Sequence, residues 1–260
     1  METAAGYFRP GASWLHRRHP TTKLLALAWL IVGAFVLPPG PSAAIVAVVM
    51  AGAASVGLLG PLLRASRVGL VLLASILVVN GFFYPGAHDV LLGLGPFALT
   101  REGLEAGVVF AVRILVALEG SLLFLFTTLA DDLLEALVER GVNPRLAWVM
   151  LAAMQLVPRL QARARAILDA QQARGLEVSG SLRRRAGAVL PLVGPLLLST
   201  LIDVRERTFA LEARGFASGL PRTAYRVVAD TRGDRLLRWL LLATLAGLLF
   251  YGLARAAGAA

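Results

Sequence analysis

The chain has 260 residues, of which 57% are hydrophobic and 16% charged, and a mean hydropathy of +0.72, a composition typical of a membrane protein. Its net charge of +10 would suit nucleic-acid binding, but that function needs basic residues interleaved with exposed aromatic side chains, whereas here the arginines flank apolar runs. No cysteine occurs, which excludes disulfides, thiolate metal sites and cysteine nucleophiles.

Five apolar runs predict membrane-spanning helices, because a span needs about 20 mainly apolar residues. In chain order they are 24–37, 43–63, 68–84, 104–129 and 236–253. The first run could belong to a cleavable signal peptide, but the second follows it at once and favours an uncleaved hairpin. The sequence therefore predicts an all-α, polytopic membrane protein with about five transmembrane helices.

The arginines predict the orientation of these spans, because basic residues gather in cytosolic loops. The turn at 38–42 is uncharged and the loop at 85–103 is nearly neutral, so both are expected outside. The stretch 140–185 holds nine arginines and is expected in the cytosol. The N-terminus is also expected there, since four basic residues precede the first span: Arg9, Arg17, Arg18 and Lys23.

Two apolar stretches, 146–157 and 186–202, interrupt the basic region. If either crossed the membrane, arginines would be stranded outside, so both are predicted to skirt or dip into the inner leaflet without crossing. The predicted domain organisation is an N-terminal segment with four spans over 1–129, cytosolic coupling helices over 130–234, and a last span with the C-terminus over 235–260.

Each of these stretches leads into an amphipathic helix, with a basic face beside an apolar stripe. The face of the first helix contains Arg163 and Arg174, and the matching face of the second contains Asp203 and Arg214. Both helices end in the same tripeptide, Ala173-Arg174-Gly175 in the first and Ala213-Arg214-Gly215 in the second. Arginine then glycine is also an ordinary helix end, since a cation suits the negative end of the dipole and glycine accepts a left-handed cap. The repetition in two similarly built helices nevertheless predicts two equivalent contacts.

This pattern resembles the T component, the transmembrane scaffold subunit, of energy-coupling factor (ECF) importers of vitamins and metal ions. Further similarity lies in residues 16–23 before the first span, in 94–104 before the fourth, and in Thr127-Thr128 after it. The turn His19-Pro20-Thr21-Thr22 departs from the Asp-Pro-Arg-Thr typical of the family.

The resemblance implies that Arg174 and Arg214, with the small residues beside them, dock into grooves on two ABC ATPase subunits, either identical or different. An arginine presents a planar fork suited to bidentate pairing with carboxylates. It also implies a membrane S subunit that binds the vitamin or metal ion, no cofactor or metal in this chain, and a bacterial or archaeal inner membrane. The chain would couple ATP hydrolysis to uptake without being an enzyme.

Three alternatives compete with this interpretation. Asp131, Asp132 and Glu135, with Asp230 and Asp234, could hold magnesium diphosphate as in membrane prenyltransferases, although acids at a helix start also favour its dipole. The permease of a conventional ABC importer would offer one coupling helix per chain, whereas this chain has two. Histidines could bind a metal, but surface positions are favoured for all three: His16, His19 and His88.

Two charges, Arg113 and Glu119, lie within the fourth apolar run, and charges inside a membrane usually have a function. They are six residues apart, which is about 240° around a helix, so we expect them to face different partners. Pairing with neighbouring helices and contact with a substrate-binding subunit both remain open.

An ATPase is excluded, because a phosphate-binding loop needs Gly-Lys-Ser/Thr and the only lysine is Lys23, between Thr22 and Leu24.

Overall fold

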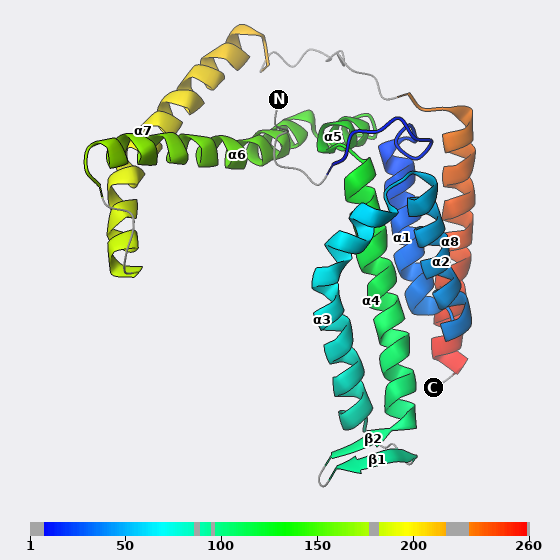
Figure 1. Ribbon diagram of the computed structural model, residues 1–260. Helices are drawn as coiled ribbons and strands as arrows, with labels where there is room; N and C mark the ends of the chain where they lie inside the picture. The colour runs from blue at the N-terminus through cyan, green and yellow to red at the C-terminus, as the bar shows by residue number, and fades with distance from the viewer. Residues whose placement is uncertain (1–7, 86–88, 95–96, 177–181, 217–228, 259–260) are drawn as a thin grey trace. The chain divides into compact units, whose positions relative to one another are not determined.

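A computed structural model describes residues 8–85, 89–94, 97–176, 182–216 and 229–258 (Figure 1). Contacts divide the chain into two compact units. The transmembrane unit, Tyr7–Arg140 with Val228–Ala260, contains α1 (Pro20–Val36), α2 (Pro39–Ser55), α3 (Leu59–Phe83), β1 (Val90–Leu94), β2 (Phe97–Thr100), α4 (Arg101–Thr127), α5 (Ala130–Val138) and α8 (Arg232–Gly258). The two-helix unit contains α6 (Pro144–Ala173) and α7 (Leu182–Ala213).

The predicted fold class is confirmed. Among the described helices, α3, α4 and α8 are long and apolar enough to cross a membrane, while α1 and α2 are shorter apolar helices of 17 residues each. Seventeen residues make a helix of about 25 Å, at the lower limit for a span. Together these helices correspond to the five apolar runs.

The boundary between the second and third runs was predicted wrongly. The structure ends α2 at Ser55 and starts α3 at Leu59, so residues 59–63 belong to the third helix, as do Arg64 and Arg67. Gly57 has φ +72°, and the N–H of Leu58 donates to the carbonyl of Ala53. This is a glycine-terminated helix end, which hydropathy did not detect because the flanking residues are apolar.

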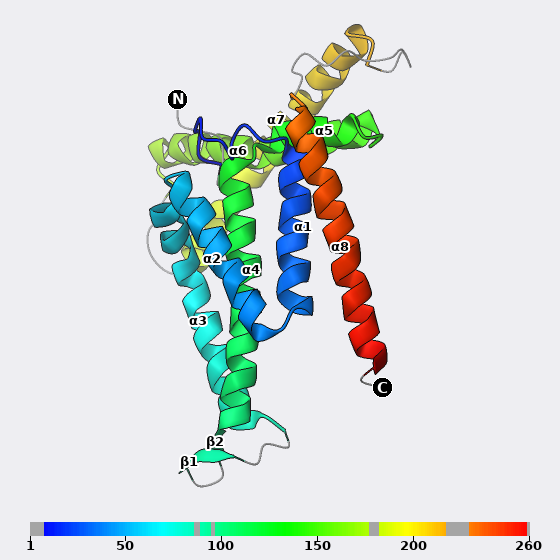
Figure 2. The ribbon, with the colours of Figure 1, turned by 90° about the vertical axis from the view of Figure 1, so that its right-hand side faces the viewer.

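In the transmembrane unit, α4 lies between α3 and α1 and also contacts α2, while α1 packs against α8 (Figure 2). Small residues allow the close approach of α3 and α4, as in many membrane helix pairs. A Cβ atom at Gly103 would collide with the backbone oxygen of Asn80, and one at Gly107 would lie 3.4 Å from the Cα of Leu77. Between these two helices, β1 and β2 form an antiparallel hairpin within the loop predicted at 85–103.

Each apolar stretch of the basic region and the amphipathic segment after it form one continuous helix. In α6 the helix passes through Pro158, and in α7 it passes through Pro191 and Pro195. Neither helix is among those long and apolar enough to cross a membrane, within the described part of the chain. The two-helix unit is therefore built from two long, mixed-polarity helices of 30 and 32 residues.

Candidate functional site

The end of α6 is a glycine-terminated cap of the Schellman type. Gly175 has φ +92°, its N–H donates to the carbonyl of Gln172 (2.9 Å), and the N–H of Leu176 donates to that of Gln171 (3.0 Å). These bonds satisfy carbonyls that a helix end otherwise leaves unpaired. Arg174 is the last residue before the left-handed glycine.

The end of α7 repeats this geometry. Gly215 has φ +70°, its N–H donates to the carbonyl of Glu212 (2.9 Å), and the N–H of Phe216 donates to that of Leu211 (3.0 Å). The residue before the glycine is again an arginine, Arg214. The predicted capping role of the two tripeptides is thus confirmed, and the two helix ends are matched in backbone geometry.

Both capping arginines are exposed. Within the described residues, neither the guanidinium of Arg174 nor that of Arg214 makes a hydrogen bond or an ion pair. Each lies at the negative end of a helix dipole, which favours a cation there. The alanine and glycine on either side of each arginine leave its surroundings open to another backbone.

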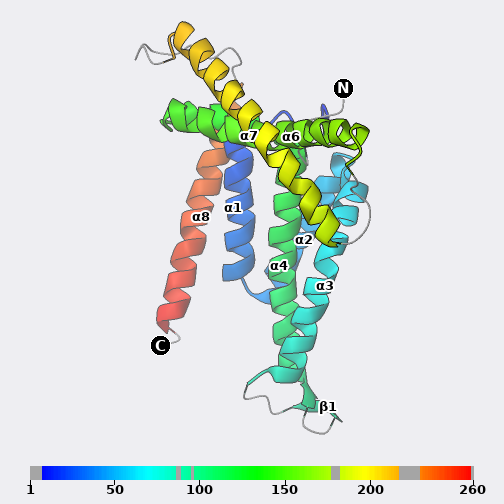
Figure 3. The same cartoon turned by 90° about the vertical axis from the view of Figure 1, so that its left-hand side faces the viewer.

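An ion pair joins α6 to α7 where they cross (Figure 3). The Arg163 guanidinium donates to both carboxylate oxygens of Asp203, at 2.8 and 3.2 Å, and to the backbone oxygen of Ser199 at 3.2 Å. Arg163 was predicted on the basic face of the first helix, and Asp203 on the matching face of the second. The structure shows that these faces meet each other at this point.

The crossing places the two helix ends at equal distances from it. Arg174 lies eleven residues after Arg163, and Arg214 lies eleven residues after Asp203. At the rise of an α-helix, each arm is about 16 Å long. Figure 3 shows that the two arms point away from the crossing in different directions.

A cavity of about 390 Å³ lies beside the crossing, between α6 and α7. Its walls include Trp148 and Leu156 of α6 and Arg207 and Leu211 of α7. The ring of Trp148 contacts that of Phe216 edge to face, at 5.5 Å between centroids. The start of α6 therefore packs against the residue that follows the cap of α7.

The two charges of α4 face different neighbours, as their spacing predicted. The Nε of Arg113 donates to the backbone oxygen of Ala34 in α1 (3.2 Å), and its guanidinium lies 5.6 Å from the Phe35 ring. Glu119 is 1% exposed, and its Oε2 has no hydrogen-bond partner among the described residues, since the hydroxyl of Ser66 in α3 donates to the backbone oxygen of Leu63. The contacts of Arg113 tie α4 to α1 and favour the structural interpretation of that charge, whereas both interpretations of Glu119 stay open.

The structure shows the positions of the acidic residues of the enzyme alternative and pairs two of them, Asp230 and Asp234, with arginines. Asp131 and Asp132 lie in the first turn of α5, where the helix-dipole interpretation placed them. Both oxygens of Asp230 accept from Arg238, and Asp234 accepts from Thr231 and Arg18. The described residues contain no group of three or more histidine or acidic side chains able to hold a metal ion.

The Nε2–H of His16 donates to the backbone oxygen of Arg9, and its Nδ1 accepts from the hydroxyl of Ser13. The Nδ1 of His19 caps the start of α1 by accepting from the backbone N–H of Thr21. His88 lies outside the described residues. The expected surface position was wrong for His19, which is 1% exposed because its ring is enclosed at the start of α1.

Sequence reasoning missed a polar cluster at the starts of α1 and α8 and the end of α4. The Nζ of Lys23 donates to the backbone oxygen of Thr127 (2.6 Å), and Arg238 donates to the hydroxyl of Thr22 (3.1 Å). These bonds give the 19–22 turn a structural role. The resemblance to the T component over residues 16–23 and at Thr127-Thr128 was the one signal that pointed to it.

The pKa values of two ionisable groups beside this cluster are lowered. The Arg238 guanidinium, which donates to Asp230, lowers the pKa of that carboxyl. Burial lowers the pKa of His19, which is 1% exposed, because an imidazolium there would lose its hydration. The cluster is therefore built for a charged Asp230 and a neutral His19 near pH 7.

Comparison with known proteins agrees with this architecture. Residues 11–225 match the family model described as CbiQ, cobalt transport protein. The chain belongs to this family. It is 31% identical over 249 residues to an energy-coupling factor transporter transmembrane protein, EcfT, of Acidaminococcus fermentans, with 92% of each chain covered. It is 34% identical over 242 residues to the EcfT protein of Bacillus selenitireducens, with 85% of this chain and 86% of the relative covered.

A third relative, from Bifidobacterium longum, is described as a putative ABC transporter ATP-binding protein. It is 31% identical over 245 residues, which cover 90% of this chain but 31% of that longer protein. Family membership makes this chain a multi-pass membrane protein of a transporter.

Proposed function

We propose that this chain is the T component of an ECF-type importer, in which the ends of α6 and α7 each dock one ABC ATPase subunit. The observation that carries the proposal is the pair of matched helix ends, each presenting an exposed arginine, Arg174 or Arg214, at the tip of an arm of about 16 Å. The ATP-binding protein of Bifidobacterium longum that contains a similar region supports ATPase partners.

The chemistry of the tips fits docking into an acidic groove. An exposed arginine whose guanidinium has no partner among the described residues can form a bidentate pair with a carboxylate. Once a partner covers the pair, each bond becomes a desolvated charge-assisted contact, and loss of one side of such a contact costs about 2–5 kcal/mol. The flanking glycines and alanines let the partner's backbone come close.

The shared crossing at Arg163 and Asp203 would couple the tips. When the ATPases close on ATP, a movement of one tip would be carried to the other helix through this ion pair and the Trp148–Phe216 contact. A membrane S subunit would receive that movement and would select the vitamin or metal ion. The chain itself would carry no catalytic site.

The proposed location is the inner membrane of a bacterium or archaeon, with the N-terminus, α6 and α7 in the cytosol. The lack of cysteine makes a direct test simple, since single cysteines can be added at exposed positions. A membrane-impermeant thiol reagent should label Leu91→Cys, in the hairpin, from outside intact cells. Gln172→Cys should be labelled only after lysis, and labelling of intact cells at this position would reverse the orientation.

The docking proposal is tested with Arg174→Ala, Arg214→Ala and the double variant, purified with their ATPases. Each single variant should keep one anchor and stay assembled, because the remaining tip holds the ATPases at high effective concentration. ATP-driven uptake should fall in both. The double variant should lose its ATPases.

Matched controls are Arg165→Ala and Arg205→Ala, since each is an exposed arginine nine residues before a tip arginine on the same helix. Both should retain assembly and uptake. If the double tip variant also keeps its ATPases at the level of these controls, the tripeptides are helix caps only. One copy of the chain per two ATPases would separate the T component from a conventional permease dimer.

A further inference from the structure

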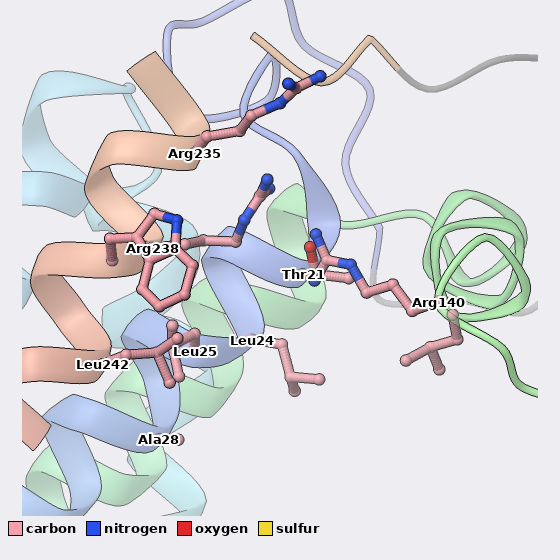
Figure 4. A pocket seen from close by; sticks show the side chains of 10 residues that line it. Thr21, Leu24, Leu25, Ala28, Arg140, Arg235, Arg238 and Leu242 are labelled. Atoms are coloured by element: carbon pink, nitrogen blue, oxygen red, sulfur yellow. The ribbon is translucent and has the colours of Figure 1, made fainter. Parts of the chain in front are cut away.

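The transmembrane unit contains a cavity that the coupling role does not use. It has a volume of about 610 Å³ and lies between the first turns of α1 and α8 and the end of α5 (Figure 4). This size is within the range of small-molecule sites, about 300–1,000 Å³. All the elements that line it belong to one compact unit.

The lining of the cavity is divided into a basic end and an apolar end. Figure 4 shows Arg235, Arg238 and Arg140 at successively lower positions, and Leu24, Leu25 and Leu242 beyond them along the helices. The division follows the helix axes, since Leu24 is near the start of α1 and Leu242 is one turn beyond Arg238 in α8. The basic end therefore lies where both apolar helices begin, which is the level of the membrane surface.

The basic end has more positive than negative charge. The carboxylate of Asp230 pairs with two arginines. Its two oxygens accept from Arg238 at 2.7 and 2.9 Å, and one of them lies 3.4 Å from the Nε of Arg235. The guanidinium of Arg140 makes no hydrogen bond or ion pair with the residues that the structure describes. Burial and the nearby charge of Arg238 lower the pKa of Arg140, while the carboxylates of Asp230 and Glu139 act in the opposite direction, so a further anion beside Arg140 would stabilise its charged form.

The apolar end is continuous with a surface that faces lipid. Trp239, which lines the cavity, is 69% exposed, and no residue of the most apolar part of α8 is buried. Tryptophan is enriched at the level of lipid headgroups. A soluble anion would leave this end of the cavity unfilled, whereas a lipid chain would cover it.

We propose that this cavity is a binding site for an anionic phospholipid of the cytosolic leaflet. Its phosphate would contact Arg140 and Arg235, and one acyl chain would lie along Leu24, Leu25 and Trp239. Basic pockets between membrane helices on the cytosolic side bind anionic headgroups in this way. The leaflet rests on the orientation given under Proposed function, but the charge and shape of the cavity do not.

The test uses the full chain purified with its ATPases. Native mass spectrometry counts bound lipid after titration with phosphatidylglycerol or with phosphatidylcholine of the same chain length. The wild-type complex should retain phosphatidylglycerol selectively. In the double variant Arg140→Gln/Arg235→Gln its affinity should fall roughly 10- to 30-fold, as expected for two surface arginines. Arg238 is left intact because it holds Asp230 and Thr22.

The matched control is Arg255→Gln, which removes an exposed arginine from the last turn of the same helix α8 and should leave selectivity unchanged. Trp239→Ala should weaken the retention of phosphatidylglycerol and should not increase the retention of phosphatidylcholine. Equal retention of the two lipids by the wild type, or unchanged retention by the double variant, would overturn the site.

Two further outcomes would also overturn it. Displacement of the lipid by inorganic phosphate alone would assign the cavity to a soluble anion. Lipid binding by the isolated chain but not by the complex would mean that a partner protein fills the cavity. Cysteine labelling at Leu91 and Gln172 is independent of all these measurements, so a wrong orientation would be distinguished from a wrong site.

Discussion

The ion pair between Arg163 and Asp203 offers a direct perturbation of the two-helix unit. Its side chains are 37% and 35% exposed, so the pair is partly shielded from solvent, and its geometry is bidentate. Exposed pairs contribute about 0.2–1 kcal/mol and hydrogen bonds to charged groups about 1.5–3 kcal/mol. We therefore expect a coupling energy of about 1–2 kcal/mol from a double-mutant cycle on this pair.

The larger consequence is expected at the helix ends. With arms of about 16 Å, a 10° change in the crossing would move each tip by about 3 Å, which is the length of a hydrogen bond. Asp203→Asn keeps the size of the side chain but removes its charge. It should therefore broaden the distribution of distances between the tips by about this amount.

The assay is pulsed electron paramagnetic resonance between spin labels on Gln172→Cys and Glu212→Cys, both exposed and each two residues before a tip arginine. The swapped pair Arg163→Asp/Asp203→Arg should restore a narrow distribution, because it reverses the ion pair without removing it. Asp169→Asn, at a carboxylate of α6 outside the pair, is the control. If Asp203→Asn leaves the distribution as narrow as in the wild type, packing alone fixes the crossing and the argument from the ion pair fails.

Two further predictions concern the transmembrane unit. Gly103→Ala should destabilise the purified complex by about 1–3 kcal/mol and lower its melting temperature, because the added Cβ would collide with the backbone oxygen of Asn80. Gly247→Ala is the control, since nothing lies within 4 Å of a Cβ atom there, and it should leave the melting temperature unchanged. Equal melting temperatures of the two variants would refute the close approach of α3 and α4. Because burial lowers the pKa of His19 below its ordinary 6.5, the stability that its neutral form contributes should be lost as pH falls below that value. His19→Asn, which keeps a helix-capping side chain, should flatten the dependence of melting temperature on pH between about pH 7.5 and 5.5, and His16→Asn should not; an unchanged slope in His19→Asn would contradict the assignment.

The sequence alone determined the helical membrane character and the nature of the two helix ends. Hydropathy over a window of residues is a local property, and the five apolar runs correspond to α1, α2, α3, α4 and α8. The caps at Gly175 and Gly215 are local as well, since a left-handed glycine needs only the residues of its own last turn. For the same reason the different directions of Arg113 and Glu119 followed from their spacing along one helix.

Only the tertiary structure decided which residues meet. Arg163 and Asp203 are forty positions apart, and periodicity assigned each to a face of its helix without naming the helix that the face would contact. The same holds for Lys23 with Thr127, and for the three arginines that converge at one cavity from two separate parts of the chain. The helix end at Gly57 was also hidden, because its apolar neighbours continue the hydropathy of the span while the backbone turns. Local patterns fix the conformation of a segment and its amphipathic face, but the partner of that face depends on the register and crossing of helices distant in sequence.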